Sequence, residues 1–189
     1  MTIPIAPNVD CVKKIQCKSN SPRCIVIAGP NGSGKTTFAR EFLTREGEVV
    51  HFVNADLIAG GLAPLNPQSA VLAAGKILIR ELDRLASARE SFSFESTLSG
   101  LGYLRRLKRY KSSGYQIEFV YLMLDSPPLA LRRIASRVKQ GGHNVTREDV
   151  LRRFERSWVN FVTIYRPIAD RWSVYDNSCS IPRLVDQNP

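Results

Sequence analysis

The sequence predicts an α/β fold in which helices cover both faces of a mainly parallel sheet. From Arg23 onward, short apolar runs alternate with amphipathic stretches along the 189-residue chain. Strands that alternate with helices at this spacing need crossover connections, and such connections place consecutive strands in parallel. The chain length is that of one ordinary domain.

Five segments have the β-branched and aromatic composition, or the alternating pattern, that is typical of strands. They are residues 24–28, 49–53, 91–94, 117–124 and 172–175. Helices are expected between them, because apolar side chains recur there every three or four residues. The expected helices cover 35–44, 68–89, a stretch that carries Leu101, Leu104 and Leu107, a stretch opened by Pro127, and a stretch that follows the N-cap Thr146.

The domain organisation is expected to be simple. Residues 1–22 hold Pro4, Pro7 and the turn-forming cluster Ser19-Asn20-Ser21-Pro22, and we interpret them as an N-terminal extension. Residues 23–189 are expected to form a single domain, with a helical lid around 127–160. The first residues show no secretory signal and the apolar runs are too short for a membrane helix, so the expected location is the cytoplasm without membrane contact.

The cysteines and histidines do not suggest a metal site. No C-x-x-C pair is present, and the two histidines are far apart in sequence. We therefore expect free thiols rather than structural zinc, with one cysteine buried at the start of the first strand. The residues concerned are Cys11, Cys17, Cys24, Cys179, His51 and His143.

One motif carries the strongest functional signal. The run Gly29-Pro30-Asn31-Gly32-Ser33-Gly34-Lys35-Thr36, followed by Thr37, fits the pattern G-x-x-x-x-G-K-[ST] between a predicted strand and a predicted helix. Glycines allow backbone N–H groups to surround a phosphate, and Lys35 would reach the β- and γ-phosphates. The Thr36 hydroxyl would coordinate Mg²⁺. The sequence therefore predicts a P-loop NTPase fold, similar to nucleotide kinases, with ATP and Mg²⁺ as cofactors.

Two strand ends carry candidate residues for work on an acceptor molecule. Asp56 follows the second predicted strand, and Glu95 and Thr97 follow the third. The carboxyl ends of parallel strands beside a phosphate loop are where such folds place reactive groups. Asp56 could therefore take the proton of an acceptor hydroxyl. The simpler interpretations remain open, namely that Asp56 caps a helix and that Glu95 is a surface charge.

The phosphate loop is also similar to that of ABC transporter ATPases, and Leu98-Ser99-Gly100 resembles the start of their signature motif. In those proteins an apolar strand after the signature ends in Asp-Glu. Here Ser126 follows Asp125, so the position of the hydrolytic glutamate is not filled. This argues against an ABC ATPase.

The order of these segments resembles the zeta-toxin family of P-loop kinases between about residues 23 and 177. The resemblance rests on the phosphate loop and on the segments 52–56, 94–98 and 137–145. In length the chain resembles the compact bacterial branch of the family, often labelled as predicted ATPases. Members transfer the ATP γ-phosphate to the 3′-hydroxyl of UDP-N-acetylglucosamine, and a small antitoxin protein restrains them. The resemblance implies the same kinase chemistry here.

The resemblance also implies roles for individual residues. The catalytic base falls on Asp56, and the acid and threonine that contact the substrate fall on Glu95 and Thr97. The catalytic lysine of the loop falls on Lys35, and an arginine that clamps the nucleotide falls on Arg137. A second clamping residue falls at or near His143, so this role passes to His143, Arg147 or Arg153.

The charge balance indicates an acidic ligand or partner without choosing one. Lysine and arginine number 27 and aspartate and glutamate 17, which gives a net charge of +10. A basic run at 105–111 fits a solvated helix face, an acidic antitoxin or nucleic acid, of which nucleic acid is the least expected. The arginines of 132–156 pose the same choice between lid function and solvated surface. Overall the sequence predicts a small-molecule kinase, with an ATPase or nucleotide-binding switch without an acceptor as the alternative.

Overall fold

A computed structural model describes residues 21–46, 49, 51–139 and 145–188 of the chain. The segment predicted as an N-terminal extension thus lies almost wholly outside the described residues. One sheet runs through the described part, with the strand order β2-β3-β1-β4-β5-β6. The strands are β1 (Arg23–Ala28), β2 (His51–Val53), β3 (Phe92–Ser96), β4 (Gln116–Met123), β5 (Arg171–Asp176) and β6 (Arg183–Gln187).

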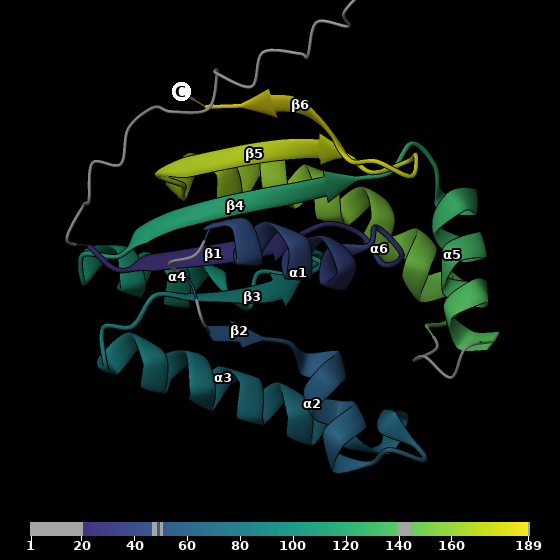
Figure 1. Cartoon of the computed structure of the whole chain (residues 1–189), viewed down its shortest axis with the longest axis horizontal. Helices are drawn as coiled ribbons and strands as arrows, with labels where there is room; N and C mark the ends of the chain where they lie inside the picture. The colour runs from purple at the N-terminus through teal and green to yellow at the C-terminus, as the bar shows by residue number, and fades with distance from the viewer. Residues whose placement is uncertain (1–20, 47–48, 50, 140–144, 189) are drawn as a thin grey trace, which may run out of the picture.

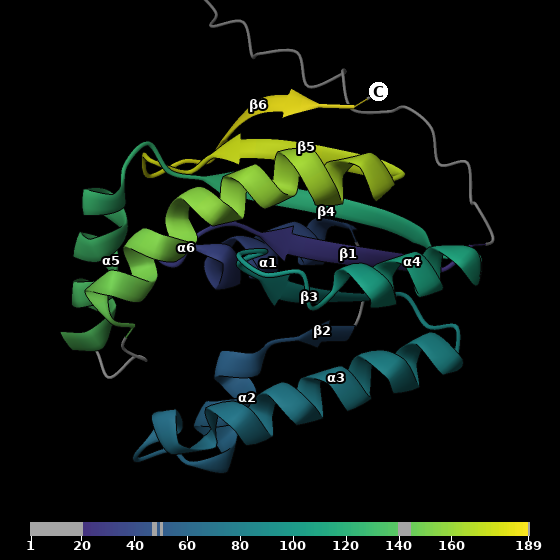
Figure 2. The same ribbon diagram turned by 180° about the vertical axis from the view of Figure 1, so that it is seen from behind.

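Helices connect the strands and lie on both faces of the sheet, as Figures 1 and 2 show from opposite sides. The strands from β2 to β5 pair in parallel, and only β6 pairs antiparallel, with β5. The predicted fold class is therefore confirmed. The helices are α1 (Lys35–Glu46), α2 (Ala55–Leu62), the 3₁₀ turn η1 (Pro67–Ala70), α3 (Val71–Ser87), α4 (Leu104–Ser112), α5 (Pro127–Lys139), α6 (Arg147–Asn160), the π-helical turn η2 (Phe161–Tyr165) and the 3₁₀ turn η3 (Arg166–Ile168).

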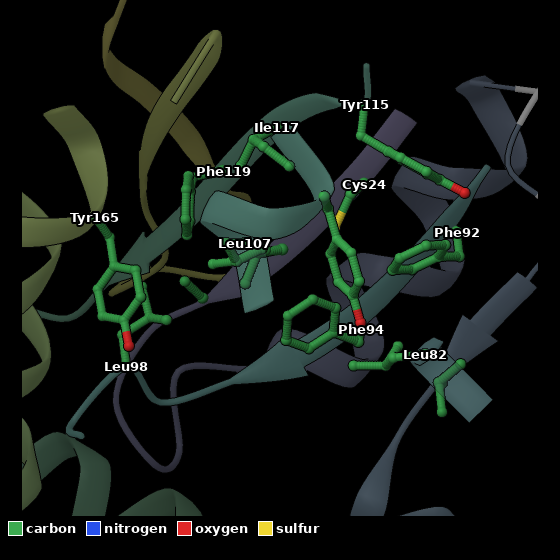
Figure 3. Packing of buried hydrophobic residues seen from close by; sticks show 14 of the residues in the cluster. Cys24, Leu82, Phe92, Phe94, Leu98, Leu107, Tyr115, Ile117, Phe119 and Tyr165 are labelled. Carbon is green, nitrogen blue, oxygen red and sulfur yellow. The ribbon is translucent and has the colours of Figure 1, made fainter. Parts of the chain in front are cut away.

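The alternation of side chains along β1 builds two cores. Ile25 and Ile27 face α1, with which they form a small cluster. Cys24 and Val26 face the opposite side, where α3, α4 and η2 cover the sheet with a larger, aromatic-rich cluster. Figure 3 shows this second core, in which the strand residues meet aromatic and leucine side chains of the helices. Because side chains point to alternate faces of a strand, a strand buried on both sides reads as a continuous apolar run.

Several element boundaries differ from those predicted. The helix expected over 68–89 begins as a 3₁₀ turn, which Pro67 opens, and continues as α3. Helix α3 ends at Ser87, and Arg89 beyond it adopts a left-handed φ of 56°. Strand β3 extends to Ser96, so Glu95 belongs to the strand and does not follow it. Strand β2 begins at His51, and residue 50 lies outside the described residues.

The antiparallel strand β6 was not predicted. All five of its residues are exposed, so apolar and polar side chains need not alternate in it and no pattern marks it as a strand. Among the described residues, no helix has both the length and the apolar character needed to cross a membrane.

Candidate active site

The phosphate loop lies at the centre of the sheet, between the end of β1 and the start of α1. Gly29, Gly32 and Gly34 have φ values of 141°, 81° and 83°, which side-chain-bearing residues rarely adopt. A Cβ atom on Gly29 would lie 2.3 Å from the Leu122 carbonyl oxygen, and one on Gly32 would lie 2.8 Å from that of Ala130. The loop is therefore packed so closely against β4 and α5 that these positions require glycine.

Lys35 is partly buried, and its Nζ donates hydrogen bonds of 2.9 Å to the carbonyl oxygens of both Gly29 and Pro30. Burial lowers the pKa of Lys35 to about 8, while the nearby carboxylates of Glu95 and Asp56 act in the opposite direction and Arg137 lowers it further. The ammonium group thus lies at the loop, where it can exchange carbonyl oxygens for phosphate oxygens.

A cavity of about 630 Å³ opens in front of the loop, at the carboxyl edge of the parallel strands. It brings together most residues that the sequence predicted for the site. Those that line it are Asn31, Gly32, Gly34, Lys35, Thr36, Thr37, Asp56, Glu95, Thr97 and Arg137. Of the others, Gly29 and Pro30 accept the hydrogen bonds of Lys35, Ser33 is fully buried, and His143 lies outside the described residues.

Asn54, and not Asp56, caps helix α2. The Asn54 Oδ1 accepts hydrogen bonds from the backbone N–H groups of Asp56 (2.8 Å) and Leu57 (3.1 Å), and Asn54 is 4% exposed. Asparagine is among the preferred N-cap residues. The carboxylate of Asp56 is exposed at the second position of the helix and lines the cavity, so the structure does not give it the capping role considered above.

Glu95 and Thr97 enter the cavity from the end of β3. Burial raises the pKa of the Glu95 carboxyl; the charge of Lys35 acts against this, and Asp56 raises the pKa further. The Glu95 Oε1 is buried without a hydrogen-bond partner, so it is placed to accept a donor from a ligand. The Thr97 hydroxyl lies 2.9 Å from that of Ser99.

The loop after Thr97 is held in an unusual conformation. Leu98 is buried and has a φ of 53°, a region that costs a leucine conformational energy. The Asn160 side chain donates to the Leu98 carbonyl at 2.7 Å, and the Tyr165 hydroxyl donates to that of Gly100 at 2.7 Å. Leu98 and Tyr165 lie beside each other in Figure 3. The end of α6 and the π-helical turn thus fix the segment that carries Thr97.

The residues at the start of α1 suit a magnesium ion. The Thr36 hydroxyl lines the cavity and lies 3.5 Å from the Asn54 amide nitrogen, and the Glu95 and Asp56 carboxylates face the same space. Hydroxyl and carboxylate oxygens are the ligands that Mg²⁺ prefers. Within the described ranges no group of three His, Cys, Asp or Glu side chains is able to hold a metal ion. Mg²⁺ usually completes its shell with water and phosphate oxygens, so the donor set fits.

Arginines from α5 and α6 form the opposite wall. Arg133, Arg137 and Arg153 line the cavity, and Asp149 pairs with Arg152 and, at 3.1 Å, with Arg153. Arg147 is exposed and does not line the cavity. Of the residues considered for the second clamp, Arg153 is therefore the one that the described structure places at the site.

Sequence reasoning missed the segment between β5 and β6. Asn177, Cys179, Ser180 and Pro182 line the cavity, and the Asn177 side chain donates to the Ser33 carbonyl of the phosphate loop at 2.7 Å. Arg133 donates to the carbonyls of Asn177 (2.8 Å) and Ser178 (3.1 Å), so this arginine ties α5 to the segment. The only available signal was the position of Asn177 at the carboxyl end of a strand.

Two carboxylates, Asp83 and Asp170, balance part of the basic run on α4. Arg106 lies 3.6 Å from a carboxylate oxygen of Asp83, Arg109 pairs with the same carboxylate, and Lys111 lies 2.7 Å from Asp170. Arg105 and Lys108 of the same run are exposed, so the helix keeps an excess of positive charge on its surface.

The comparisons with known proteins agree with this fold. Residues 24–158, from β1 through the phosphate loop to α6, match the model of an AAA domain family, AAA_33. The chain belongs to this AAA domain family. A P-loop domain of this family implies nucleotide binding, and the fold is that of P-loop kinases. The chain is also 34% identical over 140 residues to an uncharacterized protein of Haemophilus influenzae, a match that covers 74% of this chain and 96% of the relative.

Solved structures share the fold of this AAA domain at low identity. A chain of the PezAT toxin-antitoxin system of Streptococcus pneumoniae has a TM-score of 0.65 and 17% identity, covering 89% of this chain and 72% of that one. A chain of the AvrRxo1-ORF1:AvrRxo1-ORF2 complex reaches 0.71 at 14% identity, covering 88% and 58%. A gluconokinase of Sinorhizobium meliloti 1021 reaches 0.54 at 17% identity, covering 84% of each chain.

Proposed function

We propose that this protein is a kinase that transfers the γ-phosphoryl group of ATP to a hydroxyl group of a small molecule. The observation that carries the proposal is the Asp56 carboxylate, which faces the same cavity as the phosphate loop while Asn54 caps the helix. A carboxylate without a structural task, beside a triphosphate site, is suited to accept the proton of an attacking hydroxyl.

In this mechanism the protein mainly positions the reactants and balances charge. Lys35 and the arginines Arg137 and Arg153 contact the phosphates and compensate the charge that develops on the moving group. Asp56 takes the hydroxyl proton as the acceptor oxygen forms its bond to phosphorus and the bond to ADP breaks. Thr36 would hold Mg²⁺, which would compensate further charge on the phosphate oxygens.

Helices α5 and α6 would form the lid expected around residues 127–160, within one domain that extends over 23–189. They pack against each other through a cluster that includes Leu124, Ala130, Ile134 and Val150. Closing this wall over the nucleotide would exclude water from the γ-phosphate and limit wasteful hydrolysis.

The resemblance to zeta toxins adds two finer candidates. It names UDP-N-acetylglucosamine as an acceptor, contacted by Glu95 and Thr97, and a small antitoxin protein as a partner. The PezAT chain comes from a toxin-antitoxin system, and its fold, shared at 17% identity, is what supports the second candidate. The kinase proposal depends on neither.

The test is a transfer assay with ATP labelled at the γ-phosphate. Purified protein is incubated with nucleotide sugars, NAD, nucleosides and simple sugars, with and without a chelator in excess of Mg²⁺. Label is expected to appear in one acceptor, only with free Mg²⁺. Lys35→Ala should abolish the transfer, whereas Lys76→Ala, an exposed lysine of α3, should not. Hydrolysis that no acceptor changes would instead establish the ATPase or nucleotide switch.

A further inference from the structure

We propose that the acceptor is a neutral or positively charged hydroxyl compound, one that brings no phosphate or carboxylate group into the cavity. This inference rests on the proposed kinase function and specifies the class of its acceptor. It argues against UDP-N-acetylglucosamine, the acceptor that the resemblance to zeta toxins implies, because that molecule carries a diphosphate. It follows from the way the cavity separates its charges between two walls.

The cationic wall belongs to the nucleotide. Lys35 lies in the phosphate loop itself, and Arg133, Arg137 and Arg153 line the cavity from α5 and α6. A triphosphate in the loop would therefore engage these positive charges.

The opposite wall is formed by the ends of β2 and β3 and the starts of α2 and α3. Its lining residues include Asn54, Ala55, Asp56, Val71, Glu95 and Thr97. Within the described structure, neither lysine nor arginine lines this wall. The arginines of α4 do not supply the missing charge, because none of them lines the cavity.

This wall offers acceptors of hydrogen bonds under a negative potential. Asp56 and Glu95 both line this wall, one from the start of α2 and the other from the end of β3. The buried Oε1 of Glu95 has no hydrogen-bond partner in the described structure, and it can be satisfied by a donor group or a cation but not by a phosphate or carboxylate anion. Phosphate and carboxylate groups are usually recognised by arginine forks or by clusters of N–H groups, and here they would meet two carboxylates instead.

The potential of the wall can be measured without knowing the acceptor. Val71, on the acidic wall, is exposed and is replaced by cysteine, and the native Cys179, on the cationic side, serves as the matched reference. Both proteins carry Cys11→Ser and Cys17→Ser, and the Val71→Cys protein also carries Cys179→Ser. Cys24 is fully buried and remains. Melting temperature and nucleotide binding confirm that each variant is folded.

Each thiol is treated at low salt with a cationic and an anionic methanethiosulfonate reagent. For each cysteine, the rate with the cationic reagent is divided by the rate with the anionic reagent, and this ratio is divided by the same ratio for a free thiol in solution. The intrinsic reactivity of the cysteine cancels, so the result reports the local electrostatic potential. The ratio of cationic to anionic reaction rates at position 71 is expected to exceed the ratio at Cys179 by about tenfold or more. Added salt should reduce this difference. An equal or smaller preference at position 71 would overturn the inference.

The second measurement compares related acceptors that differ in charge. N-acetylglucosamine is set against its 1-phosphate and UDP-N-acetylglucosamine, uridine against uridine monophosphate, and glucose against gluconate and glucosamine. The neutral or amine-bearing member should react with a kcat/KM at least about tenfold higher. Faster transfer to an anionic member would remove this inference but leave the kinase proposal intact. ATP hydrolysis without transfer to any acceptor would refute the kinase proposal. The thiol reaction rates would still show whether the wall is negatively charged.

Discussion

The lowered pKa of Lys35 predicts that nucleotide affinity depends on pH in a range where few other groups titrate. Burial disfavours the ammonium form, and the pKa of Lys35 falls to about 8 in the free protein. The phosphates of a bound nucleotide favour the charged form and raise the pKa in the complex. Binding therefore takes up a proton, so affinity is fully present below pH 8 and falls as the pH rises above it.

The magnitude follows from the fraction of protein that carries the charge. At pH 9, one unit above a pKa of about 8, only about one tenth of the Lys35 side chains are protonated. The dissociation constant of ATP should therefore rise about tenfold between pH 7 and pH 9, which corresponds to about 1.4 kcal/mol. The increase continues above pH 9 until the neutral lysine itself supports the remaining binding.

The assay is calorimetric titration with ATP and excess Mg²⁺ between pH 7 and 9.5, at constant ionic strength. Phosphate groups ionise near pH 6, so the nucleotide itself hardly titrates in this window. Lys35→Arg is the matched control, because a guanidinium stays charged throughout and its affinity, although changed by geometry, should not vary with pH. A flat profile for the unmodified protein, or an equal decline in Lys35→Arg, would refute the reasoning.

Three further predictions follow from hydrogen bonds of the site. Asp56→Asn should reduce phosphotransfer to the identified acceptor by about 10²-fold or more. Its melting temperature and ATP affinity should stay unchanged, because Asn54 and not Asp56 caps the helix. A fully active variant would eliminate Asp56 as the base. Asn54→Ala leaves two N–H groups without their acceptor and should lower the free energy of unfolding by about 1–3 kcal/mol in denaturant titrations, whereas Asn54→Asp should retain most of it. Arg133→Met removes the hydrogen bonds to the carbonyls of Asn177 and Ser178 and should weaken ATP binding, measured by calorimetry. Arg132→Met, at an exposed neighbouring position, should leave ATP binding unchanged. Equal affinities of the two variants would show that Arg133 has no role in ordering this wall.

The parts of the site that could be predicted are those in which local sequence dictates local geometry. The phosphate loop requires glycine at fixed positions, so its sequence reveals its conformation. Asp56, Glu95 and Thr97 were found because they lie at strand ends, and the topology of a parallel sheet brings strand ends to one edge. The cap of α2 also had a signal, since Asn54 is a preferred N-cap residue, but Asp56 was considered for that role instead.

The unpredicted parts depend on contacts between distant segments. The segment after β5 reaches the phosphate loop only because β5 lies beside β4 and the chain then turns back as β6. Arg133 binds this segment across 44 residues of sequence, and nothing around position 133 distinguishes it from the exposed Arg132. Which of several arginines on a helix faces a site is decided by how that helix packs, and here Ala130 and Ile134 fix the buried face of α5.

The separation of charge in the cavity has a topological cause. The phosphate loop follows the central strand β1, so the ends of β3 and β2 lie on one side of it and α5, α6 and the β5–β6 segment lie on the other. Arg133 and Arg137 are four residues apart and share one face of α5, so the cations of the nucleotide side come from that helix. The residues of the acceptor side belong to other segments. The two walls are thus built by different segments, and substitutions on α2 or α3 could alter the acceptor while leaving nucleotide binding intact. Candidate acceptors of this AAA domain should therefore be chosen by the charge of the acidic wall rather than by similarity of fold.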